Sequence, residues 1–445
     1  MFNRILIANR GEIARRIIRT CKRMGIETVA VHSDADMMLP FVNEATYAIL
    51  IGLAPAHASY LNMEIILEVA QQAECEAIHP GYGFLAENPM FADRCQELGI
   101  TFIGPSPEAM TAMGEKVAAR ELMRQAGVPV APGTSEPISD IELAVTLAEE
   151  IGYPVLVKPS AGGGGIGMTI ANNADKLRQG IKTAQGRAQR AFGDDSVFIE
   201  RYVPGARHVE VQVLFDAHGH GVHLYERECS VQRRYQKVIE ETPSPALVNN
   251  PELRQRMTQA ALQAAAAVGY RNAGTVEFIL GDNGEFYFLE MNTRLQVEHP
   301  ITEMTLGLDL VELQLRVAAG EQLPLTQADL APKGHAIEYR IYAEDPVSYL
   351  PQPGTISLYQ PPELSEFVRL DSGYGKGDTI TPHYDPLIAK LVVWGENRAE
   401  ALERSRVALS QFQIEGLKTN LPLHLRLLDD PAFVSGNYNT GLLKA

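Results

Sequence analysis

The sequence has few cysteines and no long hydrophobic run. Its 445 residues include four cysteines, Cys21, Cys75, Cys95 and Cys229, with neither a C-x-x-C pair nor the spacing of a metal site. This usage is typical of a reducing compartment, so we expect a cytoplasmic protein without disulfides. No stretch reaches the roughly 18 apolar residues of a membrane span, and the N-terminus lacks the apolar segment of a signal peptide. We therefore expect no membrane association.

Positive charge is also scarce. The chain has 39 Lys and Arg against 55 Asp and Glu, a formal net charge of −16 at pH 7. Because neutralising a phosphate backbone requires a basic surface, this balance argues against nucleic-acid binding. It does not exclude small anionic ligands, which local clusters of Lys and Arg can hold. The length predicts roughly two to four domains.

The first part of the chain alternates short apolar strands with helices. Strands are predicted at residues 4–8, 28–32, 47–51 and 77–78, with helices at 11–22 and 63–73 between them. Such alternation predicts an open parallel sheet with right-handed crossovers, which is a Rossmann-like unit. The G-x-G-x-x-G fingerprint is absent after the first strand, and this disfavours dinucleotide binding.

A glycine-rich segment lies between two predicted strands, 153–157 and 169–170. It reads K-P-S-A-G-G-G-G-I-G-M from Lys158 to Met168. A Walker-type loop needs G-K-[ST] opening a helix, which is absent here. The segment therefore predicts a flap whose backbone N–H groups close over phosphates, since a plain linker would not be flanked by well-patterned strands.

Residues 275–300 predict a β-hairpin with one polar face. Gly281-Asp282-Asn283-Gly284 reads as a four-residue turn, which would pair Glu277 with Phe288 and place Glu290 one diagonal step further on. After the turn, polar side chains occupy every second position of one predicted strand: Glu290, Asn292, Arg294, Gln296 and Glu298. Two carboxylates aimed at one spot repel unless a cation lies between them, so a divalent metal is predicted. The alternative is a solvated face, but the unbroken E-x-N-x-R-x-Q-x-E order favours a binding site.

Lys158, the glycine flap and the paired carboxylates together suit ATP with Mg²⁺. Phosphoryl transfer depends mostly on positioning and charge neutralisation, for which lysines and divalent cations serve. Lys116, on a helix predicted at 115–126, is a candidate second phosphate lysine; a solvated helix lysine is the alternative.

Ordered motifs run through nearly the whole chain. They are I-L-I-A-N-R-G-E-I-A at 5–14, H-P-G-Y-G-F-L at 79–85, R-H-V-E-V-Q-V at 207–213, E-R-E-C-S-V-Q-R-R-Y-Q-K at 226–237, E-M-N-T-R-L-Q-V-E-H-P-I-T-E at 290–303, G-H-A-I-E-Y-R-I-Y-A-E-D-P at 334–346 and H-Y-D-P-L-I-A-K-L at 383–391. With the flap, they make the chain resemble the biotin carboxylase family of ATP-grasp enzymes. The resemblance implies a mixed α/β and α+β fold in three parts: a Rossmann-like open parallel sheet at 1–114, an ATP-grasp domain at 115–331 with a mobile glycine-flap lid subdomain at about 131–203, and a strand-rich C-terminal domain at 332–445.

The resemblance also implies a role for each matched residue. The ATP site would comprise Lys116, Lys158, Gly162, Gly163, Gly164, Gly165, Glu200, Arg201, Val203, His208, Gln232, Tyr235, Glu277 and Glu290. Two Mg²⁺ or Mn²⁺ ions would be held by Glu277, Glu290 and Asn292. Bicarbonate would be bound by Lys237, Arg294, Gln296, Glu298 and the backbone amide of Val297, and biotin by Tyr82 and Arg340. The catalytic residues would be Lys237, Arg294, Glu298 and Arg340.

The implied reaction begins when Glu298 deprotonates bicarbonate and the dianion attacks the γ-phosphate of ATP. Carboxyphosphate then breaks down to CO₂ and phosphate, the phosphate removes the ureido proton of biotin, and Arg340 stabilises the enolate-like oxygen. A guanidinium offers a planar anion matched donors, which suits Arg294 and Arg340. The alternatives are a structural ion pair between Arg294 and Glu298 and a surface position for Arg340.

The sequence contains no E-A-M-K-M biotin-attachment motif. We therefore expect biotin on a separate biotin carboxyl carrier protein, with carboxyltransferase subunits as further partners, as in acetyl-CoA or another acyl-CoA carboxylase. The resemblance also hints at a homodimer through Arg15, Arg16 and Arg19, for which a solvated helix face is the alternative.

Two positions depart from the family pattern. Ile166 replaces a frequent Arg or Lys in the flap, and Tyr235 replaces a frequent His or Asn. These departures leave open a carboxylase that serves urea or a keto acid. A nucleotide-binding regulatory protein without turnover is a further alternative, against which the intact catalytic residues argue.

Overall fold

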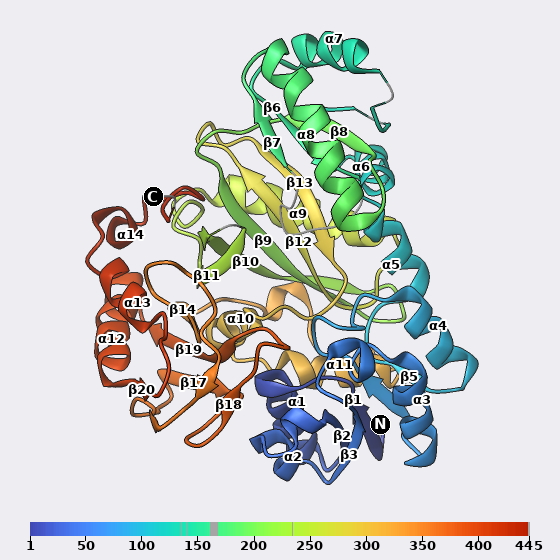
Figure 1. Ribbon diagram of the computed structural model, residues 1–445, viewed down its shortest axis with the longest axis vertical. Coiled ribbons are helices and arrows are strands. Elements are labelled where there is room, and N and C mark those ends of the chain that lie inside the picture. The colour runs from blue at the N-terminus through green and yellow to red at the C-terminus, as the bar shows by residue number, and fades with distance from the viewer. Residues whose placement is uncertain (135, 139, 161–167, 234, 444–445) are drawn as a thin grey trace.

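The protein is described by a computed structural model covering residues 1–134, 136–138, 140–160, 168–233 and 235–443. The predicted flap residues Gly162 to Gly165, together with Ile166, lie outside the described residues. Figure 1 shows a Rossmann-like unit, a small three-stranded unit and a large central sheet that continues into the C-terminal part.

The N-terminal unit is a five-stranded parallel sheet in the order β3-β2-β1-β4-β5. The predicted Rossmann-like alternation is thus confirmed. Its elements are β1 (Arg4–Ile7), α1 (Gly11–Met24), β2 (Glu27–Ser33), η1 (Asp34–Asp36), α2 (Pro40–Glu44), β3 (Tyr47–Gly52), η2 (Ala56–Ala58), α3 (Met63–Gln72), β4 (Ala77–His79), α4 (Pro89–Glu97), β5 (Thr101–Phe102) and α5 (Pro107–Gly114). The central strands are fully buried between helices, as expected for a parallel sheet.

Protein side chains fill the crevice beyond the first two strands. Arg10 follows β1 and forms a buried ion pair at 2.5 Å with Asp36, and its guanidinium also donates to the hydroxyl of Tyr374 at 2.8 Å. Tyr60 donates to the same Asp36 carboxylate at 2.6 Å. In a dinucleotide-binding unit this crevice holds the ligand. Here Tyr374, from the far end of the chain, occupies it, consistent with the missing glycine fingerprint.

A second loop is held at the point where the strand order reverses. Asn9, also after β1, donates to the carbonyls of Pro80 and Tyr82 at 2.7 and 2.8 Å. The backbone of Gly81 adopts φ +64°, and a Cβ there would lie 2.9 Å from the Asn9 amide nitrogen. Only glycine accepts both conditions without strain. The loop that carries Tyr82 is thereby set by its neighbours.

Helix α6 leads into the small unit at the top of Figure 1. Its three antiparallel strands run in the order β7-β6-β8 and are covered by α7 and α8, whose apolar faces bury residues such as Val145 and Ile181. The elements are α6 (Lys116–Gln125), α7 (Ile141–Ile151), β6 (Val155–Pro159), β7 (Thr169–Ala171), α8 (Ala174–Phe192) and β8 (Val197–Arg201). Because β6 and β7 pair antiparallel, the glycine-rich segment joins two strands, as predicted.

The largest element is an eight-stranded antiparallel sheet in the order β13-β12-β9-β10-β11-β14-β19-β17. Its strands are β9 (Arg207–Phe215), β10 (Gly221–Arg233), β11 (Gln236–Thr242), β12 (Asn272–Leu280), β13 (Phe286–Asn292), β14 (His335–Tyr342), β17 (Val368–Ser372) and β19 (Leu387–Gly395). The pairing of β11 with β14 carries the sheet across residue 332, where the sequence predicts a new domain to begin.

The remaining elements are helices and four short strands that form two separate two-stranded sheets. They are α9 (Pro251–Ala267), α10 (His299–Leu306), α11 (Leu310–Ala318), η3 (Gln327–Asp329), β15 (Gly354–Thr355), β16 (Leu358–Gln360), β18 (Thr379–Ile380), α12 (Arg398–Gln411), β20 (Gln413–Glu415), α13 (Leu421–Leu427) and α14 (Pro431–Ser435). Among the described residues, no helix is long and apolar enough to cross a membrane.

The alternation of apolar residues at 222–225 in the sequence predicts a short strand there, whereas the observed β10 continues to Arg233. The extension carries charged side chains such as Arg227 and Glu228, which a sequence pattern suggests are exposed, yet both are fully buried. Their partners lie on neighbouring strands, and this pairing can be read only from the folded sheet.

Candidate active site

The predicted register of the β12–β13 hairpin is wrong. The turn spans five residues, and Phe278, not Glu277, pairs with Phe288. An irregularity in β13 between Phe288 and Glu290 then shifts the register by one residue, so that Glu277 lies directly opposite Glu290. A β-bulge of this kind re-aims a side chain. The two carboxylates are therefore closer neighbours than a diagonal pair would be.

The polar row after Glu290 is not one continuous strand, as the sequence predicts. Strand β13 ends at Asn292, residues 293–297 form an irregular connection, and Glu298 is the N-cap residue of α10. The predicted row is thus divided between a strand, a loop and a helix start. The side chains of Asn292, Gln296 and Glu298 nevertheless gather around one cluster of charges.

Lys237 is at the centre of that cluster. Its ammonium group lies 2.5 Å from Glu210, 2.8 Å from Glu277 and 2.7 Å from Glu298. Burial opposes its charge, but the three carboxylates outweigh burial and hold the pKa of Lys237 well above its usual value. One cation thus joins β9, β11, β12 and the start of α10.

Glu298 is shared between two cations. One oxygen accepts from Lys237, and the other accepts from Arg340 at 2.9 Å. Burial disfavours its ionisation, but Lys237, Arg340 and the nearby Arg227 hold the pKa of Glu298 well below its usual value. The carboxylate is therefore ionised at neutral pH.

Arg340 is buried and bridges two carboxylates. Its guanidinium lies 2.5 Å from Glu240 on β11 and 2.9 Å from Glu298, and its Nε donates to Glu240 at 2.6 Å. The alternative of a surface position is therefore wrong. Burial and the repulsion of Glu298 raise the pKa of Glu240 to about 7, although the nearby Arg340 acts to lower it.

Arg227 and Glu210 were not singled out from the sequence, although both lie in quoted motifs. Arg227 is fully buried and donates to Glu210 at 2.6 Å and to Gln296 at 2.7 Å. The alternation of His208, Glu210 and Gln212 in R-H-V-E-V-Q-V was the available signal, since all three share one face of β9. The guanidinium of Arg227 on β10 therefore links β9, β12 and the loop before α10.

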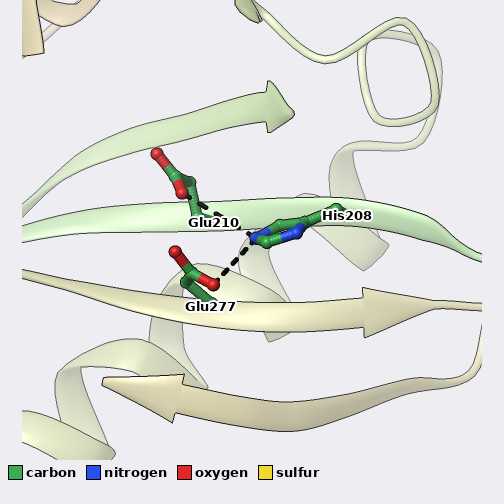
Figure 2. Close-up of side chains that lie close together, drawn as sticks. All are labelled: His208, Glu210 and Glu277. Atoms are coloured by element: carbon green, nitrogen blue, oxygen red, sulfur yellow. Dashed lines mark ion pairs between the residues drawn. The ribbon is translucent and has the colours of Figure 1, made fainter. Parts of the chain in front are cut away.

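Glu277 accepts hydrogen bonds from several directions. One oxygen accepts from Lys237, Asn292 and Gln296, the latter two at 2.9 Å, and the other lies 3.0 Å from Nε2 of His208. Burial opposes both charges, but the contact raises the pKa of His208, and Lys237 and His208 hold the pKa of Glu277 well below normal. Figure 2 shows His208 on β9 directed at Glu277 on β12, with Glu210 4.0 Å from the imidazole.

Glu290 has no comparable partners. Among the described residues no donor hydrogen-bonds to its side chain, and burial together with repulsion from Glu277 raises its pKa. The charge of Lys116 acts in the opposite direction and lowers the pKa of Glu290. A partly buried carboxylate beside an ionised one is the arrangement that a bound cation would relieve.

Arg294 does not pair with Glu298, so that alternative is wrong. Its Nε donates to Glu87 of the N-terminal unit at 2.9 Å, and a terminal nitrogen donates to the amide oxygen of Asn292 at 2.8 Å. The backbone N–H of the nearby Val297 donates to no acceptor within the described part of the chain.

The loop before α10 is also held from the C-terminal part. Lys390, fully buried on β19, donates to the carbonyl of Val297 at 2.8 Å and lies 3.1 Å from a carboxylate oxygen of Glu12. Glu12 accepts in turn from the hydroxyl of Tyr82. These contacts connect Tyr82 to the loop through buried charges that the sequence did not indicate.

On the other side of the cluster, a lysine of the small unit and an arginine of α6 contact a glutamate. Glu200 is buried and pairs with both Lys158 and Arg120. Burial opposes its ionisation, but Lys158 and Arg120 lower its pKa. Lys116 is also largely enclosed, and burial lowers its pKa. The carboxylate predicted to line an adenine site is thus engaged with cations.

The remaining predicted ATP residues lie around this region. Gln232 is buried on β10 opposite Lys237, whereas Tyr235 is 52% exposed at the β10–β11 turn with φ 68°. Arg201 ends β8 with an exposed side chain, and its backbone N–H donates to the carbonyl of Pro132 at 2.7 Å. Val203 follows it and packs near Gly281 of the hairpin turn.

Three family models match the chain. The biotin carboxylase N-terminal domain matches residues 1–110, the carbamoyl-phosphate synthase L chain ATP-binding domain matches 115–326, and the biotin carboxylase C-terminal domain matches 338–445. Biotin carboxylase 2 of Bacillus subtilis is 54% identical over 444 residues, which cover 100% of this chain and 99% of that protein. A pyruvate carboxylase component of Methanothermobacter thermautotrophicus is 51% identical over 99% of this chain and 89% of its own length.

Solved structures agree with these matches. A biotin carboxylase complex from Campylobacter jejuni superposes with a TM-score of 0.96 at 45% identity, covering 100% of this chain and 98% of the other. The biotin carboxylase domain dimer of Hydrogenobacter thermophilus 2-oxoglutarate carboxylase, crystallised with MgADP, ADP and bicarbonate, superposes with a TM-score of 0.95 at 46% identity, covering 100% and 97%. The predicted ATP-grasp architecture is confirmed, and the chain belongs to the biotin carboxylase family of ATP-dependent ligases.

Proposed function

We propose that this enzyme uses ATP and bicarbonate to carboxylate biotin on a separate carrier protein. The observation that carries the proposal is the arrangement of Lys237, Glu298 and Arg340. A carboxylate that neighbouring cations keep ionised despite its burial is equipped to accept a proton, and those cations are equipped to hold anionic reactants.

ATP would lie between the small unit and the hairpin. Lys116, Lys158 and His208 would contact its phosphates or ribose, Gln232 and Tyr235 would add further contacts, and Glu200 to Val203 would line the adenine side. The engagement of Glu200 with Lys158 and Arg120 favours backbone groups of Arg201 and Val203 as the contacts to the base. The glycines 162 to 165 would close over the phosphates.

The hairpin carboxylates fit a divalent cation. Glu277 and Glu290 are directly opposed, Glu290 lacks a hydrogen-bond donor among the described residues, and Asn292 adds an amide oxygen. Hard cations take such oxygen ligands, and we propose that these three side chains hold two Mg²⁺ or Mn²⁺ ions. When bound, the ions would neutralise charge on the transferring phosphoryl group.

Bicarbonate would lie beside Glu298. Lys237, Arg294, Gln296 and the free N–H of Val297 are the proposed donors, and Glu298 is the proposed base. In the structure Lys237 and Arg340 hold the pKa of Glu298 low, which makes it a weak base. An anion that shares these cations would raise that pKa, so binding itself prepares Glu298 to take the proton. The resulting dianion attacks the γ-phosphate and forms carboxyphosphate.

Biotin would approach Arg340. Its charge is permanent, and the guanidinium would stabilise the enolate-like ureido oxygen formed once phosphate has removed the ureido proton. Tyr82, anchored by Glu12, would flank the ring. The CO₂ released from carboxyphosphate then carboxylates the ureido nitrogen.

For partners, we propose a biotin carboxyl carrier protein, carboxyltransferase subunits and a second copy of this chain. The dimeric relative from Hydrogenobacter supports a homodimer. In this structure Arg15 and Arg19 of α1 line a cavity of about 570 Å³ together with Tyr359 and Leu364. Arg16 lies at its edge, and its own partners are internal.

The final acceptor is proposed to be acetyl-CoA or another acyl-CoA. Relatives named for pyruvate, methylcrotonoyl-CoA, propionyl-CoA and 2-oxoglutarate carboxylases match the chain at 45–51% identity, which keeps a keto acid as the alternative acceptor. The relatives named simply biotin carboxylase favour a stand-alone subunit.

The proposal is tested by measuring phosphate release from MgATP with and without bicarbonate and free biotin. ATP cleavage should require bicarbonate and rise on adding biotin, with carboxybiotin as a product. Cleavage that proceeds equally without bicarbonate would overturn the proposal. Capture of a biotinylated carrier would then distinguish an acyl-CoA from a keto-acid pathway.

Arg340→Ala separates the biotin step from ATP cleavage. Because Arg340 is proposed to act on biotin, the variant should retain slow bicarbonate-dependent ATP cleavage but lose stimulation by biotin, a loss of at least about 100-fold in carboxybiotin formation. Arg369→Ala, a partly buried arginine whose partners are Glu303 and Asp371, is a control for loss of a structural guanidinium. Equal loss of both activities in Arg340→Ala would indicate a structural role.

A further inference from the structure

Behind Arg340 lies a second carboxylate that the mechanism above does not use. Glu338 is two residues before Arg340 on β14 and is fully buried, and neither of its carboxylate oxygens has a hydrogen-bond partner among the residues that the structure describes. Along a strand, alternate side chains share a face, so Glu338 and Arg340 lie on the same side of the sheet. The acid is thus an immediate neighbour of the proposed biotin-site arginine.

Glu338 also lies directly opposite Glu240. The two residues pair in register across β11 and β14, where opposed side chains are within reach of one another. Glu240 gives one oxygen to Arg340, and its second oxygen is buried. Within the described part of the chain, this oxygen and both oxygens of Glu338 lack any hydrogen-bond donor.

The cations nearby are committed to other groups. Lys390 on β19 donates to the carbonyl of Val297, and Lys237 on β11 is surrounded by Glu210, Glu277 and Glu298. Arg340 itself is divided between Glu240 and Glu298. No cation of the described residues is left to pair with Glu338.

Helix α12 also packs against β14 and β19, but its arginines are paired elsewhere: Arg398 with Glu241, Arg404 with Glu400 and Arg406 with Asp429. Helix α10 contributes His299, whose pKa burial holds well below its usual value, so the imidazole is neutral. Glu298 precedes the same helix and adds a negative charge. At neutral pH, ionising a fully buried carboxyl group that has neither a cation nor a hydrogen-bond donor costs more free energy than keeping it protonated.

We propose that Glu338 is a neutral acid in the working enzyme, so that the Glu240–Glu338 pair carries one negative charge and holds Arg340 in place between Glu240 and Glu298. The inference rests on the function proposed above and adds Glu338 as a positioning residue. In agreement with the geometry, burial raises the pKa of Glu338 well above normal. Repulsion from Glu240 acts in the same direction, and the larger effect of Lys390 opposes it. As two coupled acids, the pair loses its proton with an apparent pKa that belongs to both.

The proposal has a specific pH consequence. While the pair holds its proton, Arg340 faces one charge on each side. Loss of that proton at alkaline pH doubles the charge behind Arg340 and draws the guanidinium away from biotin and Glu298. Biotin-dependent turnover should therefore fall on the alkaline side, whereas biotin-independent ATP cleavage should not show the same limb.

The test is Glu338→Gln in the full-length enzyme. The amide keeps the shape and the neutral charge, so carboxybiotin formation at pH 7 should stay within about threefold of wild type, and the alkaline limb should move up by at least about one pH unit. The infrared spectrum of the wild type near pH 8 should contain the carbonyl stretch of a protonated carboxyl group, and the variant should lose it. A variant that keeps both the band and the limb of the wild type would overturn the proposal.

A control and a fallback keep the result decisive. Glu344→Gln removes another buried acid, which burial gives a pKa of about 7 and which pairs with Arg233 on β10; it should leave the alkaline limb of biotin-dependent turnover in place. If Glu338→Gln does not fold, Glu338→Met should, since the position is proposed to hold a neutral side chain; failure of both to fold would overturn the proposal. The infrared result does not depend on bicarbonate or biotin, so it separates this inference from the proposed function.

Discussion

Individual side chains in the site act as parts of one charge network. Lys237 contacts three carboxylates, and Arg340 contacts two, one of which is shared with Lys237. In such a network the removal of one partner leaves the others buried and uncompensated. Substitutions that keep shape and remove one charge are therefore more informative than truncations.

Glu298→Gln tests the proposed base at this scale. The amide keeps the side-chain size but cannot accept a proton, so bicarbonate-dependent ATP hydrolysis should fall by at least about 100-fold. Affinity for ATP, measured by calorimetry, should change by no more than about threefold. Glu285→Gln, on the exposed hairpin turn, is the matched control and should retain wild-type turnover. Near-normal turnover in Glu298→Gln would assign the base elsewhere.

At the scale of elements, junctions between strands and loops position the functional groups. The irregularity in β13 brings Glu290 opposite Glu277, and the loop after β4 presents Tyr82 because Asn9 holds its backbone. Regular periodicity describes neither junction.

Gly81→Ala should displace the loop after β4. Its φ of +64° and the 2.9 Å approach to Asn9 both oppose a Cβ. Gly83→Ala is the matched control, because Gly83 has φ +70° but no atom within 4 Å of a Cβ. The first variant should lose about 1 kcal/mol more stability than the second and should raise the KM for biotin. Equal effects of the two substitutions would show that the contact with Asn9 is unimportant.

Glu241→Gln should reveal a pH-dependent link between the sheet and its helix. Glu241 on β11 pairs with Arg398 at 2.6 Å and His335 at 2.6 Å; burial opposes its ionisation, but these partners lower its pKa from 4.5 to about 2. A carboxyl group whose pKa is lower in the folded than in the unfolded state stabilises the fold at pH values above the unfolded-state pKa. This stabilisation is lost as the pH falls through the folded-state pKa. Above pH ~5 the free energy of unfolding of the wild type should therefore be about 3 kcal/mol larger than that of the variant. The difference should shrink as the pH falls from about 4.5 toward 2.

The single tryptophan, Trp394 on β19, reports this unfolding by fluorescence in a denaturant titration at each pH. Glu403→Gln, an exposed position on the same helix as Arg398, is the control and should match the wild type at every pH. A difference that stays constant between pH 7 and pH 3 would contradict the assigned pKa.

At the scale of the whole molecule, buried ion pairs join units that are distant in sequence. Arg16 of α1 is buried and lies 2.6 Å from Glu303 of α10 and 2.8 Å from Asp309. Tyr374 fills the Rossmann crevice, and the central sheet runs across the predicted domain boundary. The N- and C-terminal parts are thus packed as one support for the site.

Arg16→Met should weaken that support. Because it leaves Glu303 and Asp309 with fewer cations, the variant should lose about 3 kcal/mol of stability, measured as a lower thermal midpoint. Arg23→Met removes an arginine that pairs with the same Asp309 at 2.7 Å but is 56% exposed, so it should cost about 1 kcal/mol or less. Similar losses in the two variants would show that burial of Arg16 does not matter.

Much of this architecture can be read from the sequence. Periods of two and 3.6 residues located most helices and strands of the first 320 residues, because each element buries one regular face. The prediction for β10 was too short, since Arg227 and Glu228 are typical surface residues until partners on other strands neutralise them. The hairpin register was wrong for a similar reason: a bulge is a property of the paired strands and leaves no mark on the spacing of residues.

The sequence by itself determined the family, the ATP-grasp architecture and, apart from Glu210 and Arg227, the side chains that meet around Lys237. Side-chain identity and order are local properties, and they are enough to recognise such a set. Only the tertiary structure decided that Arg294 pairs with Glu87, that Arg340 is divided between Glu240 and Glu298, and that no described residue hydrogen-bonds to the carboxyl group of Glu338. Those facts depend on distance and burial between strands far apart in the chain, and these set the charge that each group carries.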